Sequence, residues 1–193
     1  MKAYVLNNIN EYSIKNVNIP EIGDYDTLVK VKAAGICGSD IPRIYKSGTY
    51  HYPLIPGHEF SGIVEMAGKN ASDMLNKRVG VFPLIPCMKC AQCIDKKYEM
   101  CKDYNYLGSR TDGGYAEYVK VPLWNLIELP DNVSFEQAAM LEPMAVSVHA
   151  ARRAGLLKND KSDRNLRIMI MGLGAIGMSL AMMLISEGYK YVY

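Results

Sequence analysis

The chain has 193 residues, of which 49% are hydrophobic and 22% are charged, values close to those of ordinary globular proteins. This composition excludes collagen-like, intrinsically disordered and highly charged classes. The formal net charge is only +2, and no basic run is long enough to follow a phosphate backbone, so we expect no nucleic-acid partner.

The amino-terminal segment 1–20 alternates polar and apolar residues. It lacks the basic region, apolar stretch and small-residue cleavage site of a secretory signal, so we expect a cytoplasmic protein. The longest apolar stretch, 168–185, reaches the length of a membrane span. Regularly placed glycines interrupt this stretch, and we expect no membrane association.

From Met1 to about Pro130 the sequence predicts a β-rich barrel or sandwich. Short runs rich in strand-forming residues are separated by glycine and proline, which suit turns. The predicted strands are 2–6, 27–33, 62–66, 78–82 and 115–121.

After Pro130 the pattern changes to helix. Ser134 and Gln137 form a candidate capping box, and apolar residues then recur at helical spacing, with a local interruption possible at Pro143. A polar connector, 158–165, leads to an apolar strand over 166–171, a glycine-rich turn and a helix over 175–187. We expect the methionines of this last part to pack in a core: Met169, Met171, Met178, Met182 and Met183.

Four of the five cysteines form a cluster with the spacing C-x2-C-x2-C-x7-C. Four thiolates can close a tetrahedral shell around zinc, and no position then remains for a substrate. We therefore predict a structural zinc, with an iron–sulfur cluster or unmetallated thiols as the alternatives. The predicted ligands are Cys87, Cys90, Cys93 and Cys101.

Cys37, His58 and Glu59 form a second, dispersed group of metal-binding residue types. Taken singly, each has an ordinary interpretation. A lone cysteine is most often a small buried hydrophobe, a histidine can be satisfied within a loop, and a glutamate is usually a surface charge. Spacing alone leaves both interpretations open.

The chain resembles the zinc-dependent medium-chain alcohol dehydrogenases. The pattern G-H-E-x2-G-x5-G begins at Gly57, and it follows Cys37-Gly38-Ser39-Asp40 and precedes the four-cysteine cluster and the glycine turn, in matching order. The resemblance covers essentially the whole chain. Within the family it points to the polyol branch, which includes the sorbitol, threonine and galactitol-1-phosphate dehydrogenases. The stretches 37–62 and 83–118 look most like the galactitol-1-phosphate group.

The resemblance implies a mixed β and α/β fold. We expect a GroES-like β-barrel catalytic domain over 1–157, followed by the first β–α unit of a truncated NAD(P)-binding Rossmann domain over 158–193. Sixteen residues follow Gly177, too few for the acidic residue that reads the ribose in that fold. We therefore expect a fragment that binds zinc but does not turn over substrate.

The resemblance also implies a catalytic zinc, so that the chain would bind two zinc ions. Cys37, His58 and Glu59 would hold the catalytic ion, with Glu142 as a fourth ligand or as the partner of its water. Ser39 would take the proton of the alcohol. The alternatives are that Glu142 is a solvent-facing charge at a helix end and that Ser39 is an ordinary turn serine.

The glycine turn matches the dinucleotide fingerprint G-x-G-x-x-G between a predicted strand and a predicted helix. Gly172 would permit the tight turn, Gly174 would let the backbone approach a pyrophosphate, and Gly177 would let the helix pack closely on the strand. Together with Ala175 and Ile176 they would bind NAD, with NADP not excluded. The alternative is a buried strand and helix with incidental glycines.

These features predict an oxidoreductase that transfers a hydride from a secondary alcohol of a polyol or sugar phosphate to NAD(P). Arg43, Lys46 and Arg110 lie in segments that the resemblance places near the substrate cleft, and they are candidates to bind a substrate phosphate unless they lie on a solvated face. Family members are commonly homodimers or homotetramers, which we expect here as well. The alternatives are a zinc-stabilised binding module and another zinc-dependent dehydrogenase, acting on threonine or a simple alcohol. A zinc-independent reductase is disfavoured because it would lack Cys37, His58 and the cysteine cluster.

Overall fold

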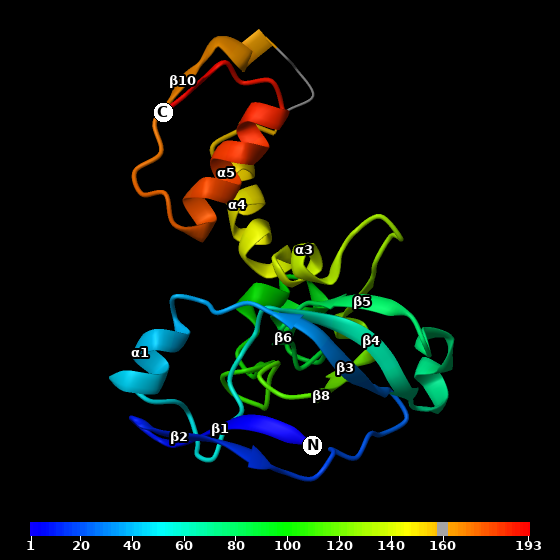
Figure 1. Cartoon of the computed structure of the whole chain (residues 1–193). Helices are drawn as coiled ribbons and strands as arrows, with labels where there is room; N and C mark the ends of the chain where they lie inside the picture. The colour runs from blue at the N-terminus through cyan, green and yellow to red at the C-terminus, as the bar shows by residue number, and fades with distance from the viewer. Residues whose placement is uncertain (158–161) are drawn as a thin grey trace. The chain divides into compact units, whose positions relative to one another are not determined.

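The computed structural model describes residues 1–157 and 162–193, which form two compact units, 1–140 and 141–193 (Figure 1). The units divide between Met140 and Leu141, earlier than the predicted domain boundary. That boundary, and the first half of the predicted connector, fall at 158–161, outside the described residues. The predicted domain division therefore stays a prediction.

The first unit is built on a curled five-stranded antiparallel sheet with the strand order β8-β3-β4-β5-β9. Four of its strands were predicted from the sequence. Irregularities in the pairing of the two longest strands increase the local twist of the sheet. The strands are β3 (Asp26–Ala34), β4 (Phe60–Ala67), β5 (Arg78–Val81), β8 (Tyr118–Pro122) and β9 (Leu126–Glu128).

The main hydrophobic core lies on this sheet. β3, β4 and β5 each contain three consecutive buried residues, so parts of these strands are covered on both faces. The largest of these buried residues is Phe60, which is 1% exposed at the start of β4. The buried cluster consists of Val29, Phe60, Val64, Val79, Val81, Leu107, Val119 and Val121.

A hairpin of β1 (Lys2–Asn8) and β2 (Glu11–Asn16) lies beside the sheet. Asn10 closes the hairpin in the left-handed region, at φ 61°, which asparagine tolerates better than most residues. Single bridges from Ala3 to Ala116 and from Leu6 to Leu54 connect β1 to the rest of the unit. The strand β2 was not predicted, because it is mostly exposed and carries little hydrophobic signal.

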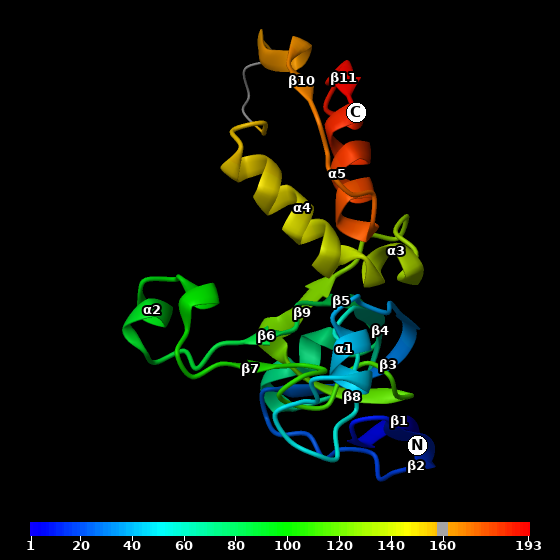
Figure 2. The ribbon, with the colours of Figure 1, turned by 90° about the vertical axis from the view of Figure 1, so that its left-hand side faces the viewer.

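The four-cysteine segment forms a lobe that projects from the sheet, as Figure 2 shows. Its base is the short pair β6 (Leu84–Ile85) and β7 (Asn105–Tyr106), and its outer part holds α2 (Ala91–Ile94) and the 3-10 turn η2 (Tyr98–Met100). Two other 3-10 turns, η1 (Lys69–Met74) and η3 (Leu123–Asn125), connect strands of the main sheet.

Two short helices complete the first unit, α1 (Asp40–Tyr45) and α3 (Phe135–Ala139). The predicted capping box of α3 is confirmed, because Ser134 and Gln137 each satisfy a backbone group of the other. The helical run breaks at Met140 and not at Pro143. Pro143 instead lies in the first turn of the next helix, where its missing N–H removes no hydrogen bond.

The second unit contains α4 (Leu141–Arg153), η4 (Ser162–Asn165), β10 (Arg167–Ile168), α5 (Ala175–Ser186) and β11 (Tyr191–Val192). The strands β10 and β11 are parallel, with α5 between them in the chain, which is a β–α–β order. Helices α4 and α5 pack together, and the Ser147 hydroxyl donates to the Ile176 carbonyl at 2.9 Å. The predicted helix is confirmed, whereas the predicted strand is shorter than expected.

The prediction that the methionines of this unit are buried is wrong for four of them. Met169 is 77% exposed, Met171 91%, Met178 54% and Met182 67%. Within the described residues β10 and β11 form a two-stranded sheet, which offers the methionine side chains around it little surface to pack against. Met183 does pack, against the small core of Ala151, Leu184 and Tyr189.

The longest helices of the described chain are α4 and α5, with 13 and 12 residues. A helix that crosses a bilayer needs roughly 20 residues, so neither of them is a candidate membrane span.

Candidate metal centres

The pairing of β3 with β4 brings the dispersed cysteine, histidine and glutamate together. Ala34, at the end of β3, pairs with Phe60, at the start of β4. Cys37 follows the first strand, while His58 and Glu59 directly precede the second, so all three lie at one end of the pair. The Gly35 amide also donates to the Glu59 carbonyl at 2.7 Å. The Cys37 sulfur, a His58 ring nitrogen and a Glu59 oxygen all lie within 4.8 Å of one another.

The donor set and its surroundings fit a zinc ion. Thiolate, imidazole and carboxylate are the ligands that zinc takes in proteins, and three of them leave a coordination position for another group. His58 and Glu59 are each 5% exposed, and Cys37 is half-buried. The Glu59 carboxylate occupies the space that a side chain on Gly35 would fill. The residues are therefore held in place by packing.

Asp40 is a carboxylate in direct contact with this centre. It is fully buried and pairs with Arg43, and its Oδ1 lies 3.6 Å from His58 Nδ1, a buried atom without a hydrogen-bond partner in the described chain. Its Oδ2 accepts hydrogen bonds from the Cys37 amide at 3.3 Å and the Tyr115 hydroxyl at 2.8 Å. A carboxylate facing one ring nitrogen is the usual arrangement for a histidine whose other nitrogen binds metal.

The electrostatics keep Asp40 charged and Tyr115 neutral. Burial acts to raise the pKa of Asp40, but His58, the Tyr115 hydroxyl and Arg43 together outweigh it and lower that pKa below its ordinary value. Burial and the neighbouring charge of Asp40 raise the pKa of Tyr115. The phenol therefore keeps its proton and donates a hydrogen bond to the Asp40 carboxylate. The exposed Ser39 hydroxyl lies beside the same centre and donates to the Cys37 sulfur at 3.3 Å.

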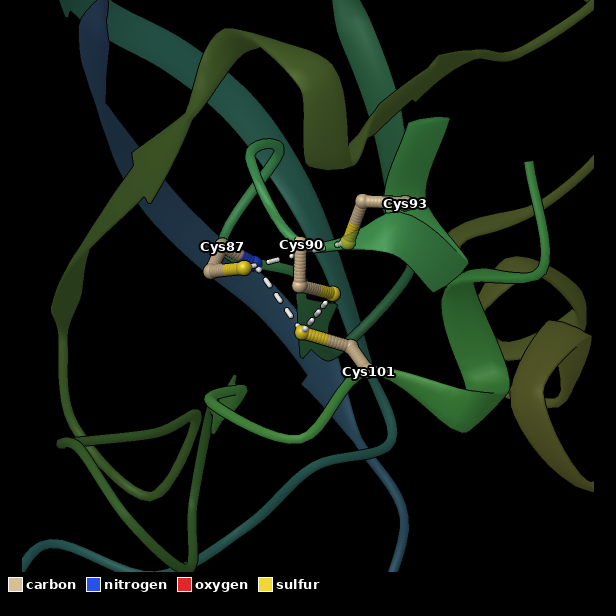
Figure 3. A group of neighbouring side chains, drawn as sticks. All are labelled: Cys87, Cys90, Cys93 and Cys101. Carbon is tan, nitrogen blue, oxygen red and sulfur yellow. Dashed lines mark hydrogen bonds between the residues drawn. The ribbon is translucent and has the colours of Figure 1, made fainter. Parts of the chain in front are cut away.

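The four clustered cysteines form a second candidate centre, shown in Figure 3. Their sulfurs all lie within 4.8 Å of one another, and two pairs, Cys87 with Cys93 and Cys90 with Cys101, are 3.9 Å apart. A regular tetrahedron with metal–sulfur bonds of about 2.3 Å has sulfur–sulfur edges of about 3.8 Å. The lobe thus presents the geometry of a single tetrahedral ion. An iron–sulfur cluster would need the sulfurs farther apart, because several metal atoms must lie between them.

The lobe also shows why a metal would stabilise it. Met88, inside the first C-x2-C turn, has the left-handed φ of 59°, which costs energy for a side chain of this kind. A backbone hydrogen bond from Cys93 lowers the pKa of Cys90 to about 6, whereas burial raises the pKa of Cys93 to about 12. Without metal the sulfurs would therefore differ in charge, and a bound ion would deprotonate all four.

The glycine turn of the second unit combines a left-handed glycine with a close approach of two backbone segments. Gly172 has φ +100°, and a side chain on Gly177 would collide with the Gly172 carbonyl. By contrast, a side chain on Gly174 would meet nothing within 4 Å. Gly174 caps α5, which Ala175 and Ile176 begin. Their role in cofactor binding stays a prediction.

The remaining predicted residues lie in different surroundings. Arg43 is paired with Asp40 and is thus not available as a free anion ligand, whereas Lys46 is exposed at the end of α1. The Arg110 guanidinium lies between the rings of Tyr50 and Tyr104, at 4.0 and 4.3 Å from their centroids. Glu142 lies in the first turn of α4, in the second unit, and its bond to a metal stays a prediction.

Two residues of the first centre were not identified as functional from the sequence. Asp40 stood in the quoted Cys-Gly-Ser-Asp pattern, but nothing in the pattern assigned it a role. Tyr115 gave no signal, because its contact with Asp40 joins residues 75 positions apart. Tyr106 also lies near, with its ring 5.9 Å from that of His58.

A cavity of about 500 Å³ in the first unit is lined by residues that include His51 and Arg110. None of the candidate ligands Cys37, His58 and Glu59 lines it.

Comparison with known proteins places these centres in a family context. Residues 23–131 match the alcohol dehydrogenase GroES-like domain. The chain is 38% identical over 176 residues to galactitol 1-phosphate 5-dehydrogenase of Escherichia coli strain K12, an alignment that covers 90% of this chain and 49% of that protein.

Two solved structures are similar as well. The crystal structure of galactitol-1-phosphate dehydrogenase from Escherichia coli matches with a TM-score of 0.90 and 36% identity, over 100% of this chain and 54% of that one. A putative zinc-binding dehydrogenase from Sinorhizobium meliloti 1021, bound to NADP, matches with a TM-score of 0.88 and 34% identity, over 99% and 54% of the two chains. The chain thus spans about half the length of the proteins it matches.

Proposed function

The chain belongs to the alcohol dehydrogenase GroES-like domain family, and on that basis we propose that it carries the metal-binding part of a zinc- and nicotinamide-dependent polyol or sugar-phosphate dehydrogenase. The reaction would transfer a hydride from a secondary alcohol of the substrate to NAD or NADP. The observation that carries the proposal is the convergence of Cys37, His58 and Glu59 within 4.8 Å of one another.

The two centres would have different tasks, because their ligands differ in number. The sulfurs of the lobe can fill all positions of a tetrahedral ion, which suits a structural site. The Cys37, His58 and Glu59 group leaves a position for a substrate oxygen or for Glu142. Zinc bound there would act as a Lewis acid that lowers the pKa of a substrate hydroxyl.

The chain's own residues would support this chemistry around the ion. Asp40 faces His58 and would keep the ring oriented. The Ser39 hydroxyl, beside the Cys37 sulfur and open to solvent, would accept the proton of the alcohol and pass it to water. In the second unit, the open backbone at Gly174 would admit the pyrophosphate of the cofactor.

For the substrate, we propose a polyol or its phosphate. We propose Arg110 as its phosphate ligand, because two tyrosine rings hold the guanidinium, and the Arg110 amide donates at 2.9 Å to the carbonyl of Tyr106, whose ring neighbours His58. We further propose a cytoplasmic location, since all five cysteines are free, as expected in a reducing compartment. The homodimer or homotetramer implied by the resemblance stays a prediction.

Metal counting tests the proposal. Purified chain should contain two zinc ions, one for each candidate centre, and Cys37→Ser should contain one. The matched variant Cys101→Ser should lose the other ion and keep the one at Cys37. Elemental analysis of the three proteins gives the counts. A single ion in the unaltered chain, retained in Cys37→Ser, would instead favour the zinc-stabilised binding module.

A further inference from the structure

Tyr115 contacts both chain segments that carry the three dispersed ligands. It lies just before β8, far from either segment in the sequence. Its ring packs against Gly57, the residue before His58, with the ring atom Cδ1 2.5 Å from the position that a Gly57 Cβ would occupy. The Tyr115 amide also donates to the Pro56 carbonyl at 3.0 Å. The ring side of Tyr115 is therefore fitted to the segment that leads into His58 and Glu59.

The hydroxyl of Tyr115 reaches the other segment. It lies 3.1 Å from the Gly35 carbonyl and 2.8 Å from Asp40 Oδ2, on either side of Cys37 in the chain. A phenol has one proton, so the shorter contact, to the carboxylate, is the stronger hydrogen bond. Asp40 Oδ2 also accepts a hydrogen bond from the Cys37 amide, and Asp40 Oδ1 faces the His58 ring. The Tyr115 hydroxyl thus holds the carboxylate that contacts both Cys37 and His58.

We propose that Tyr115 is a positioning residue of the Cys37, His58 and Glu59 centre, acting through Asp40. Its ring would keep the Gly57 segment in place, and its hydroxyl would hold Asp40 so that the Cys37 backbone and the His58 ring keep the spacing that one metal ion needs. The inference rests on the proposed metal centre and adds a residue that neither binds metal nor touches substrate.

The hydroxyl can be separated from the ring by substitution. The ring belongs to a small core with Ala3, Val5 and Ile55, so Tyr115→Phe keeps this packing and removes only the hydrogen-bond donor. The matched control is Tyr118→Phe, three positions on, whose ring lies under the Lys30 ammonium at 5.7 Å. The four-cysteine lobe serves as an internal reference within each protein.

Cobalt(II) is a suitable probe, because it accepts the tetrahedral ligand sets of zinc and absorbs visible light. Each protein is stripped of metal and titrated with cobalt(II) in competition with a chelator, and Cys37→Ser supplies the spectrum of the lobe alone. In Tyr115→Phe we expect the affinity of the three-ligand centre to fall about 10- to 100-fold, with altered cobalt bands. The lobe should titrate as in the unaltered chain, and Tyr118→Phe should match the unaltered chain at both centres.

A double-mutant cycle with Asp40→Asn tests the route of the effect. If Tyr115 acts through Asp40, the double variant should bind cobalt(II) no more weakly than Asp40→Asn alone. Fold-losses that multiply would show that the hydroxyl acts independently of Asp40 and would overturn the inference. Equal affinities of Tyr115→Phe and the unaltered chain would also overturn it, while leaving the metal centre in place. If Cys37→Ser loses no cobalt, the proposed centre itself fails and the inference with it.

Discussion

Gly57 shows how one residue shapes the backbone beside a proposed ligand. Its φ of +96° lies in a region that glycine adopts readily and other residues do not. The Tyr115 ring occupies one side of it, and the backbones of Gly108 and Gly113 pack against its carbonyl. The position of the His58 segment therefore depends on the absence of side chains at three glycines.

Gly57→Ala should destabilise the first unit by about 3 kcal/mol, because the left-handed φ and the overlap with the Tyr115 ring add together. Urea unfolding followed by Trp124 fluorescence measures the change, since Trp124 is the single tryptophan of the chain and lies in this unit. Gly38→Ala is the control, because a Cβ there meets nothing within 4 Å. Equal stabilities of the two variants would contradict the prediction.

At the scale of elements, the turn between β10 and α5 combines a close contact with an open surface. Gly177 lies in the helix, where alanine would ordinarily be the better helix former. Here a Cβ would strike the Gly172 carbonyl, and it would also come within 3.4 Å of Ile170. Gly174, at the helix cap, faces open space. The two glycines thus serve different purposes although they belong to one motif.

Gly177→Ala should loosen α5, because the collision with the Gly172 carbonyl outweighs a gain in helix propensity of about 1 kcal/mol. Hydrogen–deuterium exchange should show faster exchange of the α5 amides. In Gly174→Ala the same amides should exchange nearly as in the unaltered chain. Protection that is equal in all three proteins would show that the helix can shift to admit the methyl group at little cost.

At the scale of the whole molecule, the two units have cores of very different size. The sheet of the first unit buries a cluster that includes Phe60 and six valines. Among the described residues of the second unit, the core has three buried members, Ala151, Leu184 and Tyr189. Met169 and Met171 of that unit remain largely exposed. Since burial of apolar surface is the main source of stability, the second unit should be the weaker one.

We therefore expect two thermal transitions. Far-ultraviolet circular dichroism should report the loss of α4 and α5 at a lower temperature than the change in Trp124 fluorescence, which follows the first unit. The order is expected because the smaller core offers less hydrophobic stabilisation. Coincident transitions by the two probes would show that the units unfold as one cooperative body.

Several features could be predicted from the sequence because they depend on neighbours in the chain. The C-x2-C spacing places sulfurs on one tight turn, the Ser134 and Gln137 pair caps a helix locally, and the glycine turn joins a strand directly to a helix. The family resemblance supplied the GroES-like fold class, which the match over 23–131 confirms.

Other features were decided only by the tertiary structure. The approach of Cys37 to His58 depends on the register of β3 against β4, and Asp40 meets the hydroxyl of Tyr115, a residue distant in the chain. The exposure of Met169 and Met171 likewise depends on which surfaces cover the short parallel strands, not on their apolar character. The amino-acid sequence by itself determined the chemical types of the ligands and the local turns that present them. The distances between them required the folded sheet, because hydrogen bonds and packing between remote segments set those distances.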